Sequence, residues 1–119
     1  MEVRNREQSQ AFTTLDGSTI RVLLDATLGG AREQSLAEAS LPAGGSTQRH
    51  YHARTEEIYV LLEGSGEMEV EGDRRQVAPG DAILIPPGAW HEIRAEANEG
   101  LRFLCCCAPP YSDGDTFFE

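Results

Sequence analysis

Four residues near the middle of the chain have the side chains and the spacing to bind one transition-metal ion. The only histidines of the protein are His50, His52 and His91. Glu57 follows the first pair closely. Three neutral imidazoles and a carboxylate suit Fe, Mn, Ni, Cu, Co or Zn, and they leave one or two positions of an octahedron open. Because a substrate or O₂ can bind at an open position, this set predicts one divalent transition metal and metal-assisted chemistry.

The spacing of the first two histidines favours a strand. Alternate residues of a strand project from the same face, so His50 and His52 would point the same way from backbones about 6.6 Å apart. Imidazoles at that separation can converge on one ion at about 2.0 to 2.1 Å. Glu57 lies near the start of the apolar run EIYVLLE, where it shares a face with Tyr59. Glu56 is the nearest alternative ligand, but it belongs to the opposite face.

The elements that must position these ligands are predicted to be short strands. Turn-forming clusters of Gly, Pro and Asp recur roughly every eight to twelve residues, which is typical of a sandwich or barrel. The segments 19–28 and 32–41 could also form short helices, but the breakers at their ends favour strands. Pro86-Pro87-Gly88 cannot continue a central strand, so it bends the chain and places His91 at the start of the next strand.

Two further runs complete the strand prediction. LRFLCCC, residues 101–107, is another apolar run apart from Arg102, and it is ended by Pro109-Pro110. In EMEVEGD, residues 67–73, apolar and acidic residues alternate, so we expect Met68 and Val70 to point inward. The acidic residues of that run are then expected to face water, namely Glu67, Glu69 and Glu71.

The 119 residues are enough for one hydrophobic core and too few for two. The first ten are polar without an apolar period, and we predict a flexible N-terminal arm over residues 1–18. Residues 19–119 are predicted to form a single β-barrel domain, with the ligand motifs in 44–95. Phe117 and Phe118 in the polar C-terminal tail could pack on the barrel or on a partner.

Charge and composition exclude several classes of function. The formal net charge is -10, which disfavours nucleic acids and anionic membrane surfaces as partners. All ten basic residues are Arg, so a Schiff base or a lysine general base is excluded. No apolar run is long enough for a membrane helix, and the polar N-terminus has no signal-peptide core. The only cysteines are consecutive, Cys105, Cys106 and Cys107, which favours core packing and a cytoplasmic location over disulfides.

The sequence resembles the cupin family, in its small single-domain form, through two motifs. The first runs from Gly44 over five residues to His50-x-His52, four to Glu57 and six to Gly64. The second runs from Gly80 over five residues to Pro86-x-Gly88 and two to His91. It departs from the family only at Ala95, where cupins usually have Asn. The resemblance implies an all-β, single-domain jelly-roll barrel (double-stranded β-helix), and it implies the metal ligands His50, His52, Glu57 and His91.

The residues around the ligands are weaker candidates. Those predicted to line a substrate pocket are Gln48, Tyr59, Trp90 and Phe103. Arg54 and Arg94 could select an anionic substrate. Without a lysine, protons would have to move through Glu57, if it leaves the metal, or through an uncoordinated carboxylate.

Two functions are compatible with these features. The first is a mononuclear metalloenzyme acting on a small oxygenated substrate, because cupins of this size include dioxygenases, isomerases, lyases and polyketide cyclases. The second is a non-enzymatic module that binds a small metabolite with the help of the metal. We also predict a homodimer, because Ile58, Val60 and Leu62 make the second face of the Glu57 strand apolar.

Overall fold

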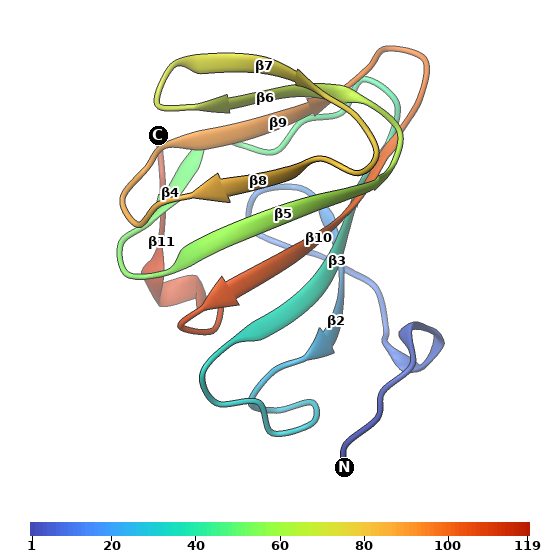
Figure 1. Cartoon of the computed structure of the whole chain (residues 1–119), viewed down its shortest axis with the longest axis vertical. Coiled ribbons are helices and arrows are strands. Elements are labelled where there is room, and N and C mark those ends of the chain that lie inside the picture. The colour runs from blue at the N-terminus through green and yellow to red at the C-terminus, as the bar shows by residue number, and fades with distance from the viewer.

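A computed structural model describes all 119 residues as two antiparallel sheets that face each other around one core (Figure 1). The elements in chain order are η1 (Arg6–Gln8), β1 (Phe12–Thr13), β2 (Thr19–Leu24), β3 (Ser35–Leu41), β4 (His50–His52), β5 (Glu56–Glu63), β6 (Gly66–Val70), β7 (Asp73–Val77), β8 (Ala82–Ile85), β9 (His91–Ala95), β10 (Leu101–Ala108), η2 (Asp113–Asp115) and β11 (Thr116–Phe118).

One sheet has the strand order β1-β2-β3-β10-β5-β8, and the other β11-β4-β9-β6-β7. The prediction of an all-β barrel is therefore confirmed. The two segments that could also have been helices contain β2 and β3, which pair with each other. The Gly and Pro breakers at the ends of these segments leave only short runs, which favours strands over helices. β9 begins at His91, as the Pro86-Pro87-Gly88 bend predicted.

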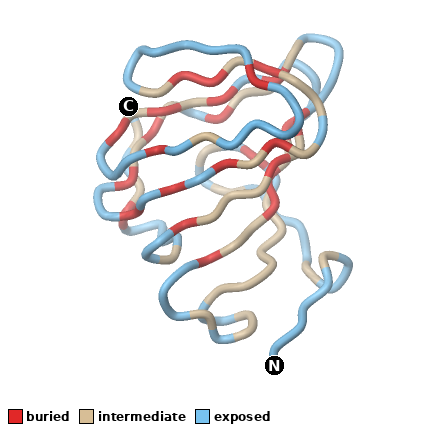
Figure 2. Tube along the Cα trace, in the orientation of Figure 1, coloured by how far each residue is buried: buried red, intermediate tan, exposed pale blue.

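Alternation along β5 places the core between the sheets. Glu57, Tyr59 and Leu61 are buried, whereas the residues between them are partly or fully exposed (Figure 2). Twelve buried apolar residues form one cluster: Ala39, Leu41, Tyr59, Leu61, Met68, Val77, Ile85, Ala89, Ile93, Ala95, Leu101 and Phe103. Burial of each large side chain contributes roughly 1.5 to 3 kcal/mol to folding.

Gly64 directly follows the end of β5, at a position where no other residue fits. Its φ is 79°, a conformation that L side chains rarely adopt, and an added Cβ would collide with the carbonyl oxygen of Gly100. The glycine therefore allows the start of β10 to approach the end of β5, and the sheet that carries Glu57 can form.

One prediction about β6 is wrong. Glu69 does not face water but is 3% exposed, and its carboxylate accepts a hydrogen bond from Arg49 Nε at 2.6 Å. The backbone N–H of Gly72 also donates to it. The alternation of the strand could not indicate this burial, because the covering cation comes from a distant part of the chain.

The two ends of the chain both reach the barrel. β1 pairs with β2, and Arg6 Nε lies 2.8 Å from the buried carboxylate of Glu38 on β3. At the other end, β11 pairs with β4. That residues 1–18 form a flexible arm in solution stays a prediction. No helix in the structure is long and apolar enough to span a membrane.

Candidate metal centre

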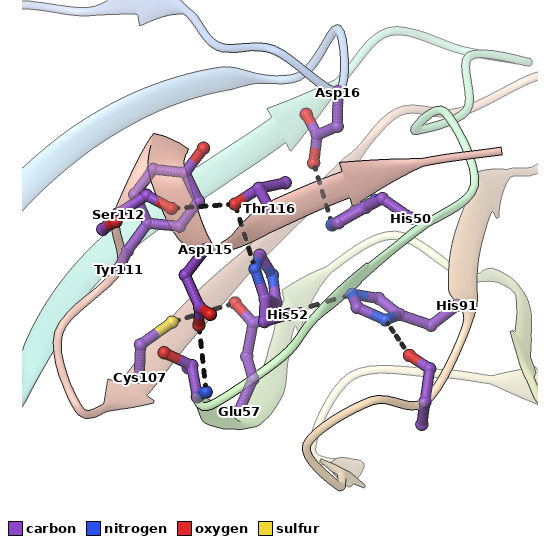
Figure 3. A network of polar contacts seen from close by, with 12 residues as sticks. Asp16, His50, His52, Glu57, His91, Cys107, Tyr111, Ser112, Asp115 and Thr116 are labelled. Carbon is purple, nitrogen blue, oxygen red and sulfur yellow. Dashed lines mark hydrogen bonds and ion pairs between the residues drawn. The ribbon is translucent and has the colours of Figure 1, made fainter.

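The three histidines meet inside the barrel. His50 and His52 come from β4, and His91 is paired with His50 across the neighbouring strand β9. All three are at most 3% exposed, and their potential ligand atoms lie within 4.8 Å of one another. Because each ring offers a nitrogen to the same point, this buried group could hold a metal ion (Figure 3).

Hydrogen bonds fix the tautomers of His50 and His91. The Nδ1 of His50 lies 2.7 Å from the carbonyl oxygen of Gln48, and the Nδ1 of His91 lies 2.9 Å from that of Ala89. A carbonyl can only accept, so both Nδ1 atoms carry the proton of the neutral ring. The Nε2 lone pairs are thereby left free for a metal.

A hydrogen bond to Thr116 fixes the tautomer of His52. The hydroxyl of Thr116 donates to the carbonyl oxygen of Ser112 at 2.9 Å, so its oxygen can accept from His52 Nδ1 at 3.1 Å (Figure 3). The Nε2 of His52 is then also unprotonated. All three imidazoles are thus held in the tautomer that binds metals through Nε2.

Glu57 completes the group from β5. Its Oε1 lies 3.3 Å from His52 Nε2 and 3.5 Å from His91 Nε2. Glu57 Oε1 and His91 Nε2 are the two buried side-chain polar atoms that have no hydrogen-bond partner. A buried polar atom without a partner costs about 1 to 3 kcal/mol, and a cation between these atoms would satisfy both. The donor set therefore fits a divalent transition metal.

The charges of the centre agree with this fit. Burial and the neighbouring His91 lower the pKa of His50 to about 4, so this ring is neutral at pH 7. Burial by itself would raise the pKa of Glu57, but positive charge at His52 and His91 would lower it to about 2, and a cation bound to their neutral Nε2 atoms would supply that charge. The other carboxylate oxygen, Oε2, accepts a hydrogen bond from the buried Cys107 thiol at 3.1 Å.

The C-terminal tail supports the turn between His52 and Glu57. The carboxylate of Asp115 accepts hydrogen bonds from the backbone N–H groups of Arg54 at 3.1 Å and Thr55 at 3.2 Å. The carbonyl of Asp115 accepts from Ala53. Since Asp115 accepts from three successive N–H groups of the turn, Glu57 is presented to the histidines in a fixed position.

A cavity of about 90 Å³ opens onto the centre. Its walls are mostly apolar and come from β2, β3, β5 and β10, with the N-terminal segment across it. Asp16 projects into it, and its Oδ2 lies 3.9 Å from His50 Nε2 (Figure 3). The lining residues are Phe12, Thr14, Asp16, Ser18, Ile20, Val22, Asp25, Ser35, Ala37, Ala39, His50, His52, Glu57, Tyr59, Phe103, Cys105, Cys107 and Tyr111.

The structure divides the predicted pocket residues into two pairs. Tyr59 and Phe103 line the cavity, with ring centroids 4.7 Å apart. Gln48 has an exposed side chain and contributes only its carbonyl to His50. Trp90 does not line the cavity, because it packs edge-on against Tyr51 at 4.7 Å. Arg54 and Arg94 are exposed and do not line the cavity either.

Sequence reasoning missed four residues around the centre: Asp16, Cys107, Asp115 and Thr116. A signal existed for the first, because Asp16-Gly17 between two threonine-rich runs is a typical hairpin turn and predicts that the sheet begins before residue 19. No comparable signal marks the two tail residues, whose role depends on a strand pairing between distant segments.

The fold and the centre agree with a comparison to known families. Residues 37–107, more than half of the chain, match the family model for the cupin domain. The chain therefore belongs to the cupin family, as its two motifs predicted.

Similar proteins include one of unknown role and two enzymes. An uncharacterised protein of Methanocaldococcus jannaschii is 44% identical over 110 residues, 92% of this chain and 88% of that protein. The 1-methylthio-D-xylulose 5-phosphate methylsulfurylase of Rhodospirillum rubrum is 43% identical over 65 residues, 54% of this chain but only 40% of that enzyme. The polyketide cyclase RemF of Streptomyces resistomycificus has a TM-score of 0.78 and 29% identity, covering 97% of this chain and 89% of its own.

Proposed function

We propose that this cupin is a mononuclear metal-dependent enzyme acting on a small oxygen-bearing molecule. His50, His52, His91 and Glu57 would hold the ion. The observation that supports this most strongly is the pair of buried, unpartnered atoms, Glu57 Oε1 and His91 Nε2, 3.5 Å apart. A fold does not normally leave two such atoms facing each other unless something binds between them.

When bound, the divalent metal would polarise an oxygen-bearing group of the substrate. The chain itself supplies orientation and protection from water. The apolar walls from β2, β3 and β10 would hold the body of the substrate, and the segment from Phe12 to Ser18 covers the cavity. These features suit a reaction of the isomerase, lyase, cyclase or dioxygenase type.

Few groups in the cavity can exchange protons with a substrate. The three histidines are bonded through Nδ1 to protein acceptors and face the centre through Nε2. Burial, above all, raises the pKa of Tyr111 to about 12, so it remains a phenol. Burial likewise raises the pKa of Tyr59, Cys105 and Cys107, so these groups stay protonated. The remaining lining groups are carboxylates: Asp16 beside His50, Asp25, and Glu57 if it leaves the ion.

The proposal is tested by the metal content of protein purified without chelator. We expect about one transition-metal ion per chain in the wild type, and a loss of nearly all of it in His52→Ala. Gln48→Ala is the matched control, because that side chain is exposed and lies two residues from His50. A wild type that contains no metal and binds none on dialysis against Fe, Mn, Ni, Cu, Co or Zn would refute the proposal.

Turnover separates the enzyme from a non-enzymatic binding module. Metal-loaded protein would be incubated with small hydroxylated and carbonyl compounds, and the mixtures followed by NMR. A product that forms with the wild type and not with His52→Ala supports the enzyme. Compounds that bind only to the metal-loaded protein and are recovered unchanged would favour the module instead.

A homodimer is part of the proposal and rests on the outer face of the first sheet. Ile58 on β5 is 38% exposed and Leu84 on the neighbouring β8 is 57% exposed. We expect light scattering to give twice the chain mass at micromolar concentration, and Ile58→Arg to give monomers. Leu15→Arg, at an exposed site in the turn between β1 and β2 rather than on β5 or β8, should leave the dimer intact. The cytoplasmic location expected from the cysteines stays a prediction.

A further inference from the structure

We propose that the cavity selects substrates without anionic groups, and that Asp16 is the residue that determines this. The substrate class is an uncharged or cationic molecule with an apolar body and a hydroxyl or carbonyl group at one end. This inference rests on the proposed metal site and goes further, because it names the charge of the substrate.

The charged residues around the cavity are all acidic. Asp16, Asp25 and Glu57 line it, and no Arg does. One divalent ion would offset only two of these three carboxylates. The chain as a whole has a net charge of -10, so its long-range field also disfavours an approaching anion.

Asp16 is fixed with one oxygen free. Its Oδ1 accepts from the backbone N–H of Ser18 at 2.9 Å and from the Ser18 hydroxyl at 2.6 Å. Its carbonyl accepts from the backbone N–H of Gln48 at 2.8 Å, which ties this turn to the residues just before β4. The side chain is 14% exposed, and the free Oδ2 points toward the His50 ring (Figure 3).

A group bound next to His50 would therefore meet a carboxylate that can only accept hydrogen bonds. A hydroxyl can donate to Asp16 while its oxygen faces the metal. An ionised carboxylate or a phosphate dianion cannot donate, and its charge would be repelled in a cavity where little water screens it. The rest of the wall, with Phe12, Ile20, Val22 and Phe103, suits an apolar body.

The groups that usually bind phosphate in proteins are also absent from the cavity. Phosphate sites commonly use Arg or Lys side chains or the N-terminus of an α-helix, and the structure has neither a basic lining residue nor an α-helix. The methylsulfurylase relative is named for a sugar 5-phosphate. We infer that the present chain differs from that enzyme in the charge of its substrate.

The test uses cobalt-loaded protein and three ligands that share one dihydroxyphenyl group. Catechol is uncharged, dopamine adds an ammonium group and 3,4-dihydroxybenzoate adds a carboxylate. Affinities would be measured from the visible spectrum of the cobalt and by calorimetry. We expect catechol and dopamine to bind at least about tenfold more tightly than 3,4-dihydroxybenzoate.

In Asp16→Asn, we expect the preference for catechol over 3,4-dihydroxybenzoate to fall at least about fivefold, with cobalt content and unfolding temperature unchanged. Asp73→Asn is the control, because it makes the same change of charge at an exposed site outside the cavity and should leave the preference unaltered. The wild-type order of the three affinities tests the charge argument even if Asp16→Asn proves unstable.

Different results of this test would contradict different parts of the proposal. If the wild type binds neither cobalt nor any of the other five metals, the proposed function is wrong and this inference falls with it. If cobalt binds but 3,4-dihydroxybenzoate equals or exceeds catechol, or none of the three ligands binds, only the assigned substrate class is wrong. An unchanged preference in Asp16→Asn would remove Asp16 as its cause.

Discussion

Two hollows of the barrel differ in size and chemistry. The cavity at the histidines measures about 90 Å³, and a surface groove of about 530 Å³ lies where the free edges of the two sheets, β7 and β8, face each other. In the groove, Asp73 pairs with Arg75 at 3.2 Å, and Asp81 accepts from the backbone N–H of Ala78. At the candidate metal centre, onto which the cavity opens, two buried polar atoms have no partner. Buried polar atoms without a hydrogen-bond partner, rather than the volume of the hollow, identify the candidate site.

The largest expected effect comes from removing a ligand. His91→Gln keeps a polar side chain of similar reach but loses the imidazole, and we expect metal affinity to fall by well over about 100-fold. Arg75→Gln, in the groove, should bind metal like the wild type. Metal titration by calorimetry measures both. Equal losses in the two variants would mean that the cavity is not the metal centre.

The stability of the metal-free protein should depend on pH through His50. The pKa of this residue falls from 6.5 in the unfolded chain to about 4 in the folded protein. Below pH 6.5 the unfolded chain takes up a proton that the folded chain does not, so the stability present above pH 6.5 is progressively lost toward pH 4. The loss would reach roughly 3 kcal/mol at most.

Urea unfolding across this pH window measures the effect, and His50→Gln should flatten the slope. The groove has no histidine, so it adds no imidazole titration here. A slope of the same size in His50→Gln would show that other groups cause the acid sensitivity.

A smaller effect is expected from the support of His52. Thr116→Val removes the acceptor of His52 Nδ1 without a large change in shape, and we expect metal affinity to fall about 10- to 100-fold. Thr116→Ser keeps the hydroxyl and should stay within about threefold of the wild type. If both variants bind metal equally, the tail does not orient the ligand.

The last prediction compares the same substitution in the two regions. Asp115→Asn weakens the acceptor of the Arg54 and Thr55 N–H groups, and we expect unfolding to become easier by about 1 to 2 kcal/mol. Asp73→Asn at the groove breaks only an exposed ion pair and should cost less than about 0.5 kcal/mol. Urea unfolding at pH 7 measures both, and equal costs would remove the contrast between the regions.

Local sequence features predicted much of the fold because the rules involved act over a few residues. Alternation along β5 placed Glu57, Tyr59 and Leu61 inside, and the bend at Pro86-Pro87-Gly88 placed His91 at the start of β9. The spacing of His50 and His52 placed both rings on one face. Pocket residues such as Gln48 and Trp90 were harder to predict. Alternation shows which side chains share a face of a strand, but not which of the two faces another strand will cover.

The sequence by itself determined that this is an all-β cupin with three histidines available to one ion, because strand period, breakers and motif spacing are local properties. Only the tertiary structure decided which groups surround the three histidines. Thr116 meets His52 across 64 positions, and Asp115 meets Arg54 across 61. Asp16 reaches His50 from a turn within residues 1–18, which the sequence predicts to be a flexible arm. Such contacts depend on which strands pair and on which residues cover a buried charge. No local sequence pattern predicts either.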